Sequence, residues 1–428
     1  MDSVDKKYFF SGFYKKLFFL LKFFLLFLPI SIIIGNSAIN INCFIIIIIY
    51  FLLFFFQKEI FLKYKKIFYI FIFFVTLSLL NIYFSNYRNL SFVATIGILR
   101  YFIIMMAFLY CLENDNKFLS LFSKILFIIL LLVSLDTLLQ YFSGKDIFGY
   151  ENLSKHGNRL TGPFGDEYIV GGYLSKLAFI SVLFLIDKNK KYHLIVYLLF
   201  TILVVILSNE RMATIMFTFS FIVYFIFSIN FNYKKKIILT VVLISALTSL
   251  FIFNKDLKEH FITKSFDQIG ITQNNSVSNE QPHYSFWDSQ WGAHFLTAFE
   301  IFKSQPLLGS GIKSFRAECR EERYEKIDSA EFKQRCNTHP HNIYFEFLSE
   351  TGILIFIPFV LLNLILTYKL IFTLFSQKKL NDFNLLIFCS FVIMFFPIQS
   401  TGAFFSTWNG FFYWLIYSFV VYALRKKT

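Results

Sequence analysis

The chain of 428 residues is long enough for two or three soluble domains, but 57% of its residues are apolar, 63 are Phe and only 16% are charged. Because so few polar side chains cannot cover a soluble surface, this composition is typical of a polytopic membrane protein. The net charge of +14 does not indicate a nucleic-acid partner, since the polar segment 255–341 holds 11 Lys and Arg against 12 Asp and Glu. The positive excess lies in short clusters beside apolar runs, as in cytoplasmic loops.

Twelve apolar runs are long enough to cross a bilayer, at about 20 residues per span. The first is longer than a signal-peptide core and a second run follows at once, so we expect an uncleaved span. The predicted fold is an all-α polytopic membrane protein of about twelve transmembrane helices. The expected spans are 17–35, 39–57, 67–84, 92–112, 118–141, 170–187, 192–208, 212–231, 237–254, 342–368, 384–400 and 405–424.

The basic clusters fall on one side of this arrangement, which the positive-inside rule makes cytoplasmic. They lie at residues 6–7, 15–16, 58–66, 117, 188–191, 234–236, 378–379 and 425–427. Both termini are therefore expected inside. The predicted division is helices one to nine (1–254), a large periplasmic loop with short helices (255–341), and helices ten to twelve (342–428).

The large loop is expected to be partly folded, because connections of this length usually carry structure or function. Aromatic residues at helical spacing in 291–302 predict an amphipathic helix that either lies on the outer leaflet or caps the bundle. The stretch 264–281, rich in Asn, Ser and Gln, is typical of a mobile loop. In an oxidising compartment Cys319 and Cys336 would form a disulfide, which would hold the following segment against the bundle.

Several motifs are absent from the sequence: G-x-x-x-x-G-K-[ST], H-E-x-x-H, C-x-x-C and Asp-x-Asp. Their absence argues against a nucleotide-driven pump, a common zinc site and a sugar-nucleotide transferase. We therefore expect no metal, no other cofactor and no nucleotide. The Gly-Ser-Gly at 309–311 is expected to be a turn.

Two histidines lie in the stretch THPHN at 338–342, where the polar loop meets span ten. In a structural interpretation, its Thr or Asn caps the helix and the histidines are interfacial polar residues. In a catalytic one, an imidazole that titrates near neutral pH takes a proton from a sugar hydroxyl. A third interpretation is a metal site with His294 or His283, although this spacing matches no familiar ligand set.

Charged residues are also predicted inside the spans. Asn342, Glu346 and Glu350 follow at four-residue steps and share one helical face. Glu350 is expected about 12 Å along the helix, where a carboxylate is either functional or part of a structural ion pair. Arg100 is expected at similar depth in span four, where it either pairs with Asp136 or lines a substrate cavity.

Arg211 follows Glu210 in a tight turn and opens span eight at the outer surface. An arginine beside a helix N-terminus offers forked donors and a positive dipole to a phosphate group. The alternative is an ordinary interfacial arginine paired with Glu210.

Together, separated stretches over roughly 141–356 resemble the O-antigen ligase and O-antigen polymerase superfamily. They are RLTGPFG at 159–165, GGYL at 171–174, SNER at 208–211, PLLGSGIKSF at 306–315 and HPHN at 339–342, with Gly352. The resemblance implies an inverting, metal-independent membrane glycosyltransferase whose donor is a glycan on undecaprenyl pyrophosphate. It implies that His341 is the catalytic histidine and that Arg211 binds the pyrophosphate.

The family has a second important arginine in the large loop, where residues 291–298 of this chain offer His294 but no arginine. That role either passes to Arg316, Arg320, Arg323 or Arg335 or is filled differently. We assign His341 and Glu350 to catalysis, Arg211, Arg320 and Arg323 to the donor pyrophosphate, and His339, Asn342, Glu346 and Arg100 to shaping the site.

The expected activity is that of an O-antigen ligase in lipopolysaccharide biosynthesis, which transfers O-antigen glycan from undecaprenyl pyrophosphate to lipid A-core. The enzyme is expected in the bacterial inner membrane with its site facing the periplasm. Its expected partners are this donor, this acceptor and membrane lipid, without nucleic acid. A polymerase would differ only in its acceptor, a second lipid-linked repeat. A transporter of the lipid-linked glycan is a further alternative, although transporters tend to place their sites near the midplane.

Overall fold

The computed structural model describes residues 3–56, 59–151, 159–187, 190–228, 233–269, 286–325, 327, 329, 332–376 and 381–426. Within these residues the regular structure is helical, and the one β-bridge, between Lys145 and Glu151, is isolated. The prediction of an all-helical chain is confirmed over this part of the sequence.

Helices coincide with all twelve predicted spans, and the sixth span is divided in two. The bundle is formed by α1 (Ser3–Ile34), α2 (Asn36–Phe56), α3 (Glu59–Phe84), α4 (Arg88–Asn114), α5 (Phe118–Ser143), α6 (Val170–Ser181), α7 (Leu183–Asp187), α8 (Lys191–Leu207), α9 (Arg211–Phe227), α10 (Tyr233–Phe253), α15 (Ile343–Ser376), α16 (Asp382–Phe395) and α17 (Thr407–Arg425). The ends of two predicted spans, residue 57 and residues 229–231, lie outside the described residues.

Six of these helices are long and apolar enough to cross a membrane, judged by length and composition. Their apolar stretches are Gly12–Ile34, Asn36–Phe55, Lys63–Phe84, Arg88–Asn114, Phe118–Ser143 and Ile343–Phe375. Shorter apolar helices occupy Val170–Ile186, Tyr192–Leu207, Arg211–Phe227 and Asp382–Phe395. The chain is thus a multi-pass membrane protein, and crossing by all twelve predicted spans stays a prediction.

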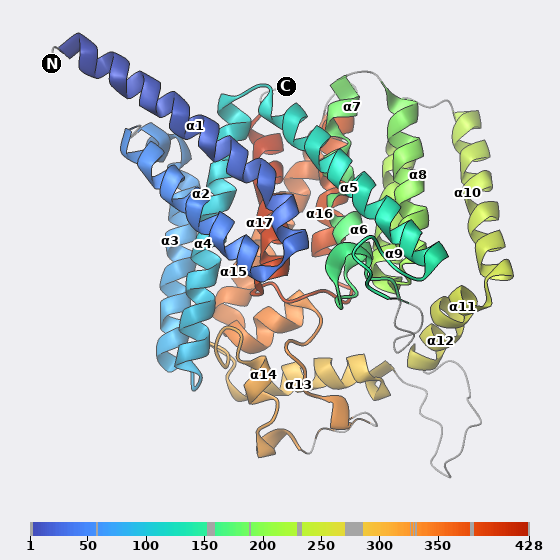
Figure 1. The fold of residues 1–428 in the computed structure, drawn as a ribbon. Helices are drawn as coiled ribbons and strands as arrows, with labels where there is room; N and C mark the ends of the chain where they lie inside the picture. The colour runs from blue at the N-terminus through green and yellow to red at the C-terminus, as the bar shows by residue number, and fades with distance from the viewer. Residues whose placement is uncertain are drawn as a thin grey trace.

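The two ends of the bundle differ. Both termini lie at one end, and the short helices α11 (Lys255–Lys258), α12 (Lys264–Ile269), α13 (Gln290–Ser304) and α14 (Phe315–Glu318) lie at the other (Figure 1). At the terminal end Lys22 pairs with Asp115 at 2.6 Å, and Lys63 and Arg425 each pair with Glu113 at 2.7 Å. The polar segment therefore lies opposite the end where basic residues of α1, α3 and α17 gather.

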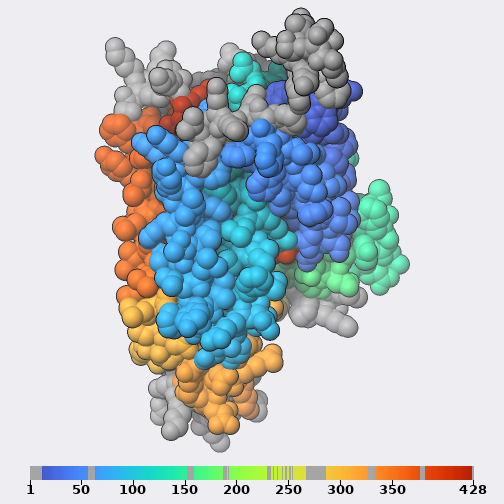
Figure 2. Space-filling model, turned by 90° about the vertical axis from the view of Figure 1, so that its left-hand side faces the viewer, coloured from blue at the N-terminus to red at the C-terminus, as the bar shows by residue number. Residues whose placement is uncertain are grey.

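Helices α1 to α4 form much of the face shown in Figure 2. Large apolar side chains of α1 and α2 are exposed: Phe19, Phe44 and Phe55 are 65%, 63% and 76% exposed. Lipid tails accept such side chains, whereas exposed apolar surface of this extent is rare on a soluble monomer.

Helix α15 is broken at Gly352, which has φ +60° and ψ −175°. Span ten was predicted as one continuous helix, so this part of the prediction is wrong. The backbone groups that the break leaves free bond to the segment 306–311: Ile353 N–H donates to Pro306 O at 2.9 Å, and Gly311 N–H donates to Glu350 O at 2.9 Å. A Cβ on Gly352 would collide with the backbone of this segment, so the close approach requires glycine.

Helix α16 ends at Phe395, five residues before the end of predicted span eleven. Residues 396–406 form no helix and lead to α17. Pro397 and Gly402 in this stretch are poor helix formers, which explains the shorter helix. We refer to residues 396–406 as the connecting segment.

Parts of the large loop follow the prediction. The amphipathic helix is α13, whose N-cap Ser289 accepts the N–H of Gly292 at 3.1 Å. It caps the bundle, because Phe295 stacks on Phe345 of α15 with ring centres 4.5 Å apart. Residues 264–269, predicted as loop, form α12, and residues 270–281 lie outside the described chain.

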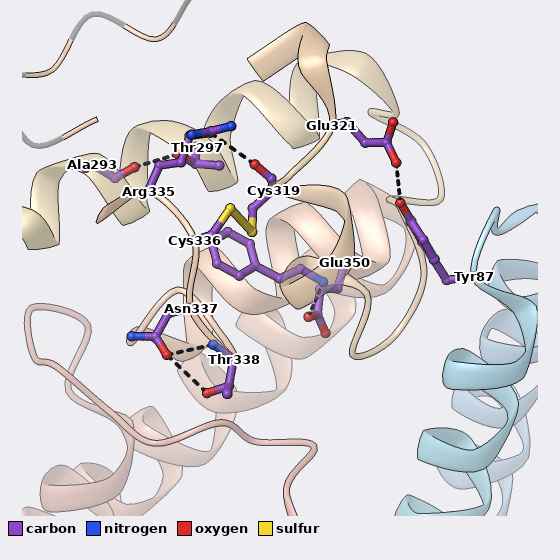
Figure 3. The surroundings of a disulfide bond; sticks show 11 residues. Tyr87, Ala293, Thr297, Cys319, Glu321, Arg335, Cys336, Asn337, Thr338 and Glu350 are labelled. Atoms are coloured by element: carbon purple, nitrogen blue, oxygen red, sulfur yellow. Dashed lines mark hydrogen bonds between the residues drawn. A yellow bond between two sulfur atoms is a disulfide. The ribbon is translucent and has the colours of Figure 1, made fainter. Parts of the chain in front are cut away.

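Cys319 and Cys336 are joined by a disulfide with their Cα atoms 5.4 Å apart (Figure 3). Arg335 braces the bridge, since its Nε donates to Cys319 O at 3.1 Å (Figure 3). The bridge links α14 to the stretch that leads into α15, as the sequence predicted for an oxidising compartment.

Candidate active site

Three histidines meet where α13 crosses the start of α15. The ring centres of His339 and His341 are 4.2 Å apart, and those of His294 and His341 are 5.2 Å apart. Trp291 presents its ring edge-on to His341 at 5.0 Å. These rings form one aromatic cluster, which we call the histidine cluster. It consists of Trp291 and His294 of α13 with His339 and His341.

The connecting segment holds the backbone of this cluster. His341 has φ +57°, a left-handed conformation that is uncommon outside glycine, although Asn, Asp and His adopt it more often than other residues. Its carbonyl accepts the Thr401 N–H at 2.7 Å. Nε2 of His339 lies 3.1 Å from Thr401 O, and its Nδ1 lies 3.0 Å from the Thr338 hydroxyl. A single threonine therefore fixes both histidines.

The imidazoles of the cluster are held neutral. Burial, reinforced by the neighbouring His339 and His294, lowers the pKa of His341. Burial also lowers the pKa of His339 to about 4 and lowers the pKa of His294. Nε2 of His341 is buried and has no hydrogen-bond partner among the described residues. In the tautomer with the ring proton on Nδ1, this nitrogen offers a free lone pair, as a general base requires.

The metal interpretation receives no support from the geometry. The described residues include no group of three or more His, Cys, Asp or Glu side chains placed to hold a metal ion. His283, the other histidine considered for such a site, lies outside the described residues.

Asn342 is the cap of α15, as the structural interpretation predicted. Its side-chain oxygen accepts the N–H groups of Tyr344 and Phe345 at 2.9 and 3.2 Å. Its amide donates to Pro397 O at 2.8 Å and to Gln399 O at 3.0 Å. Asn342 therefore ties the start of α15 to the connecting segment and shapes the site from below the histidines.

The carboxylates of Glu346 and Glu350 are buried and bind backbone N–H groups. Glu346 accepts the N–H of Phe404 at 2.7 Å. Glu350 accepts the N–H groups of Lys313 and Phe315 at 2.5 and 3.1 Å. These contacts hold the connecting segment and the 306–315 stretch against α15, and neither carboxylate forms a side-chain ion pair among the described residues.

Arg100 and Asp136 do not pair, so that alternative is wrong. The Arg100 guanidinium donates to Asn40 and, at 3.0 Å, to the Thr407 hydroxyl at the start of α17. Asp136 accepts the N–H of Ile147 at 2.8 Å. Arg100 thus stabilises the helix end that follows the connecting segment.

Arg211 and Glu210 do not pair either. The Arg211 guanidinium donates to the Ser265 hydroxyl at 3.0 Å. Glu210 accepts the N–H groups of Gly171 and Gly172 at the start of α6, at 2.6 and 3.1 Å. The interfacial ion-pair alternative for Arg211 is therefore wrong.

Further positive charge gathers beside Arg211. Burial, followed by the charges of Arg211, Lys264 and Arg159, lowers the pKa of His260 to about 4. Nε of Arg159 is buried without a hydrogen-bond partner among the described residues. We call Arg159 and Arg211 the arginine pair, because both guanidiniums lie close enough to His260 to lower its pKa.

The arginine pair is connected to the histidine cluster indirectly. No hydrogen bond or ring contact among the described residues joins Arg211 to His341. The link runs through Glu210, whose carboxylate is close enough to both Arg159 and Lys176 of α6 to interact with their charges. Lys176 in turn donates to Asn409 Oδ1 of α17 at 2.9 Å. From α17 the chain runs back through the connecting segment to Thr401 and the histidines.

The loop arginines divide into two groups. Arg323 pairs with buried Glu318, and Arg335 donates to Cys319 O at 3.1 Å. Arg316 and Arg320 instead line a pocket on the loop. The structure therefore does not bring the two residues predicted for the pyrophosphate, Arg320 and Arg323, to the arginine pair.

The chain was compared with curated proteins and with models of protein families. A search among curated proteins found no match to the chain. A family model described as O-antigen ligase matches residues 196–360. The match runs from α8 past the break in α15, so it includes Arg211, His294, His341 and Glu350. Residues 196–360 are therefore similar to the O-antigen ligase family, which supports the resemblance to the O-antigen ligase and polymerase superfamily seen in the sequence.

Proposed function

We propose that the protein is an O-antigen ligase: an inverting, metal-independent glycosyltransferase that moves a glycan from undecaprenyl pyrophosphate to lipid A-core. The observation that carries the proposal is the buried, unpartnered Nε2 of His341 in a stretch that the family model covers. The proposed location is the bacterial inner membrane, with the histidine cluster facing the periplasm.

In the proposed reaction, Nε2 of His341 takes the proton from an acceptor hydroxyl. The hydroxyl oxygen attacks the anomeric carbon of the donor sugar from the face opposite the leaving group. The bond between that carbon and the pyrophosphate oxygen breaks, and its electron pair leaves with the lipid pyrophosphate. Depression of the pKa of His341 keeps the imidazole neutral at neutral pH, so the ring can accept a proton when the acceptor binds. The same depression makes the ring a weaker base than the near-neutral imidazole expected from the sequence.

The departing pyrophosphate needs positive charge, and the arginine pair supplies it. Arg211 is the first residue of α9, so the positive end of the helix dipole can add to the charge of its guanidinium. In this proposal Arg159 fills the role of the second arginine that the resemblance led us to expect in the large loop. Both guanidiniums can bind phosphate oxygens through two parallel hydrogen bonds.

Glu350 and Glu346 are proposed as positioning residues. Removing the Glu346 carboxylate would release Phe404 of the connecting segment, which holds the histidines. Removing the Glu350 carboxylate would release the 306–315 stretch from α15. This differs from a catalytic role for Glu350, which the sequence suggested.

A polymerase is the second candidate, because the superfamily includes both activities. The two differ in the acceptor, which is lipid A-core for a ligase and another lipid-linked repeat for a polymerase. The presence of His-Pro-His-Asn at 339–342 led us to favour the ligase.

Surface glycan from cells that depend on this chain distinguishes the two. We expect His341→Asn and Arg211→Ala to stop attachment of the glycan to lipid A-core. The control is His193→Ala, at an exposed histidine in the first turn of α8, which should leave attachment normal. Loss of attachment with intact lipid-linked polymer indicates a ligase, whereas attachment of single repeats indicates a polymerase. Normal glycan ladders on lipid A-core in both variants would contradict either enzymatic activity.

A further inference from the structure

A pocket of about 720 Å³ opens on the loop beside the histidine cluster. It lies between the start of α4 and the disulfide-linked part of the loop. Figure 3 shows several of its residues around the disulfide. Its lining residues are Tyr87, Leu90, Arg316, Ala317, Arg320, Glu321, Asn337 and Thr338.

The pocket carries positive charge that its own acid does not cancel. The Glu321 carboxylate accepts the Tyr87 hydroxyl at 2.7 Å (Figure 3). Nε of Arg316 is buried without a hydrogen-bond partner among the described residues. Arg320 is exposed and forms no ion pair within the described chain. The pocket lining therefore has two guanidiniums and one carboxylate, so its net charge is positive and favours an anionic ligand.

The charges behind the pocket are mixed. The carboxylate of Glu350 acts on both Arg316 and Lys313, and it is held in place by main-chain N–H groups on both of its oxygens, so it does not extend into the pocket to pair with Arg320. Lys313 adds a further positive charge close to Arg316. An anionic ligand would offset the mutual repulsion of these cations.

The remaining lining residues suit a saccharide. Asn337 offers an amide and Thr338 a hydroxyl, which are typical partners of sugar hydroxyl groups, and Tyr87 and Leu90 provide an apolar wall. Small-molecule sites commonly combine such a wall with a few fixed polar groups.

The pocket is physically coupled to the histidine cluster. The Thr338 hydroxyl lies 3.0 Å from Nδ1 of His339. Arg320 and Asn337 each directly follow one cysteine of the disulfide, so the bridge fixes the two walls relative to one another. A sugar held here would be joined through Thr338 to the residues that surround the proposed base.

We propose that this pocket binds an acidic residue of the acceptor glycan, a sugar that carries a carboxylate or a phosphate group. The assignment of the pocket to the acceptor rests on the proposed glycosyl transfer. It gives Arg320 a role in acceptor recognition in place of the pyrophosphate-binding role that the sequence suggested.

Equilibrium binding to the purified full chain in neutral-lipid nanodiscs tests the recognition directly. The probes are glucuronate, glucose 6-phosphate, glucose and inorganic phosphate. We expect the two acidic sugars to bind at least about tenfold more tightly than glucose, which lacks the acid group that the arginines bind, and than inorganic phosphate, which lacks the sugar that the other lining residues contact. Equal binding of glucose and glucuronate overturns the proposal, and so does inorganic phosphate that binds as tightly as glucose 6-phosphate.

Variants identify the residues. Arg320→Gln is expected to weaken glucuronate binding about tenfold and leave glucose binding unchanged, whereas Lys333→Gln, at an exposed lysine of the same loop, changes neither. Unchanged glucuronate binding in both Arg320→Gln and Arg316→Gln overturns the assignment of the pocket.

A transfer assay separates this inference from the proposed function. If the wild type transfers glycan, Arg320→Gln should raise KM for an acidic acceptor about tenfold and leave KM for the lipid pyrophosphate donor unchanged. An unchanged acceptor KM overturns the acceptor role. If the wild type transfers no glycan, the proposed function is contradicted and so is the acceptor role, while the binding measurements still decide whether the pocket recognises acidic sugars.

Discussion

Replacement of Glu350 by glutamine separates a positioning carboxylate from a catalytic one. The fully buried carboxylate accepts the N–H groups of Lys313 and Phe315 at 2.5 and 3.1 Å. A glutamine amide keeps one accepting oxygen and turns an amino group toward the other N–H. One buried main-chain donor therefore loses its acceptor, and the 306–315 stretch is held less firmly against α15.

The size of the effect follows from these two contacts. A hydrogen bond to a charged acceptor contributes about 1.5–3 kcal/mol, and a buried donor left without a partner costs about 1–3 kcal/mol. Because these terms overlap, we expect the free energy of opening the stretch to fall by about 3 kcal/mol. At about 1.4 kcal/mol per factor of ten, the open population rises on the order of 100-fold.

Trypsin cleavage after Arg316 or Arg320 reports this opening when cleavage is slower than reclosing. We expect Glu350→Gln to be cleaved on the order of 100-fold faster than the wild type and to transfer glycan more slowly with an unchanged pH profile. Glu300→Gln is the matched control, since Glu300 forms an exposed pair with Lys303 at 2.7 Å, and its cleavage should stay within about threefold. A Glu350→Gln chain that resists trypsin like the wild type and has lost all transfer would refute the positioning role.

Three other changes test how the site is held together. Replacing Cys319 and Cys336 by serine should lower the free energy of unfolding by about 3 kcal/mol, because the bridge closes a loop over a separation of 17 residues; equal unfolding temperatures would contradict this. Because burial lowers the pKa of His339 to about 4, the stability it contributes is complete above about pH 6.5 and is lost as the pH falls, by about 2 kcal/mol at pH 5. His339→Asn should reduce this loss of stability between pH 7 and pH 5, and a wild type equally stable at both pH values would contradict the predicted pH dependence. Asn342→Ala should cost about 2 kcal/mol in thermal unfolding, from a lost cap and two lost carbonyl partners, whereas Thr338→Ala should cost less than about 0.5 kcal/mol; equal losses would contradict the assignment of the cap.

The sequence predicted the helices well, because apolar runs of membrane length leave few alternatives to a helix. It could not predict the break at Gly352. That break depends on backbone hydrogen bonds to the segment 306–311, which lies some forty residues away in the chain. A glycine inside an apolar run was the only local signal.

The candidate site was predicted in part. Side-chain chemistry pointed to Arg211 and to the histidines at 339 and 341, the family resemblance singled out His341, and an N-cap was expected at Thr338 or Asn342. The contacts of Glu350 were missed because its partners are main-chain N–H groups, which no pattern of residue types marks. The connecting segment was missed because residues 396–400 were counted with span eleven and residues 405–406 with span twelve.

Two basic residues were also missed. Lys176 is a lone charge in an apolar span, a signal that commonly marks a functional or paired residue. Arg159 stands at the start of a stretch that carried the family resemblance, yet only its spatial position beside Arg211 gives it a role.

Glycan transfer by the purified His341→Asn variant tests the central claim most directly. Asparagine tolerates the left-handed backbone at position 341, where φ is +57°, but cannot act as a base at neutral pH. We expect the transfer rate from undecaprenyl pyrophosphate-linked glycan to fall about 10²- to 10⁴-fold, with donor binding and unfolding temperature unchanged. A variant that transfers glycan within about tenfold of the wild-type rate, well short of the contribution of a general base, would contradict the role of His341.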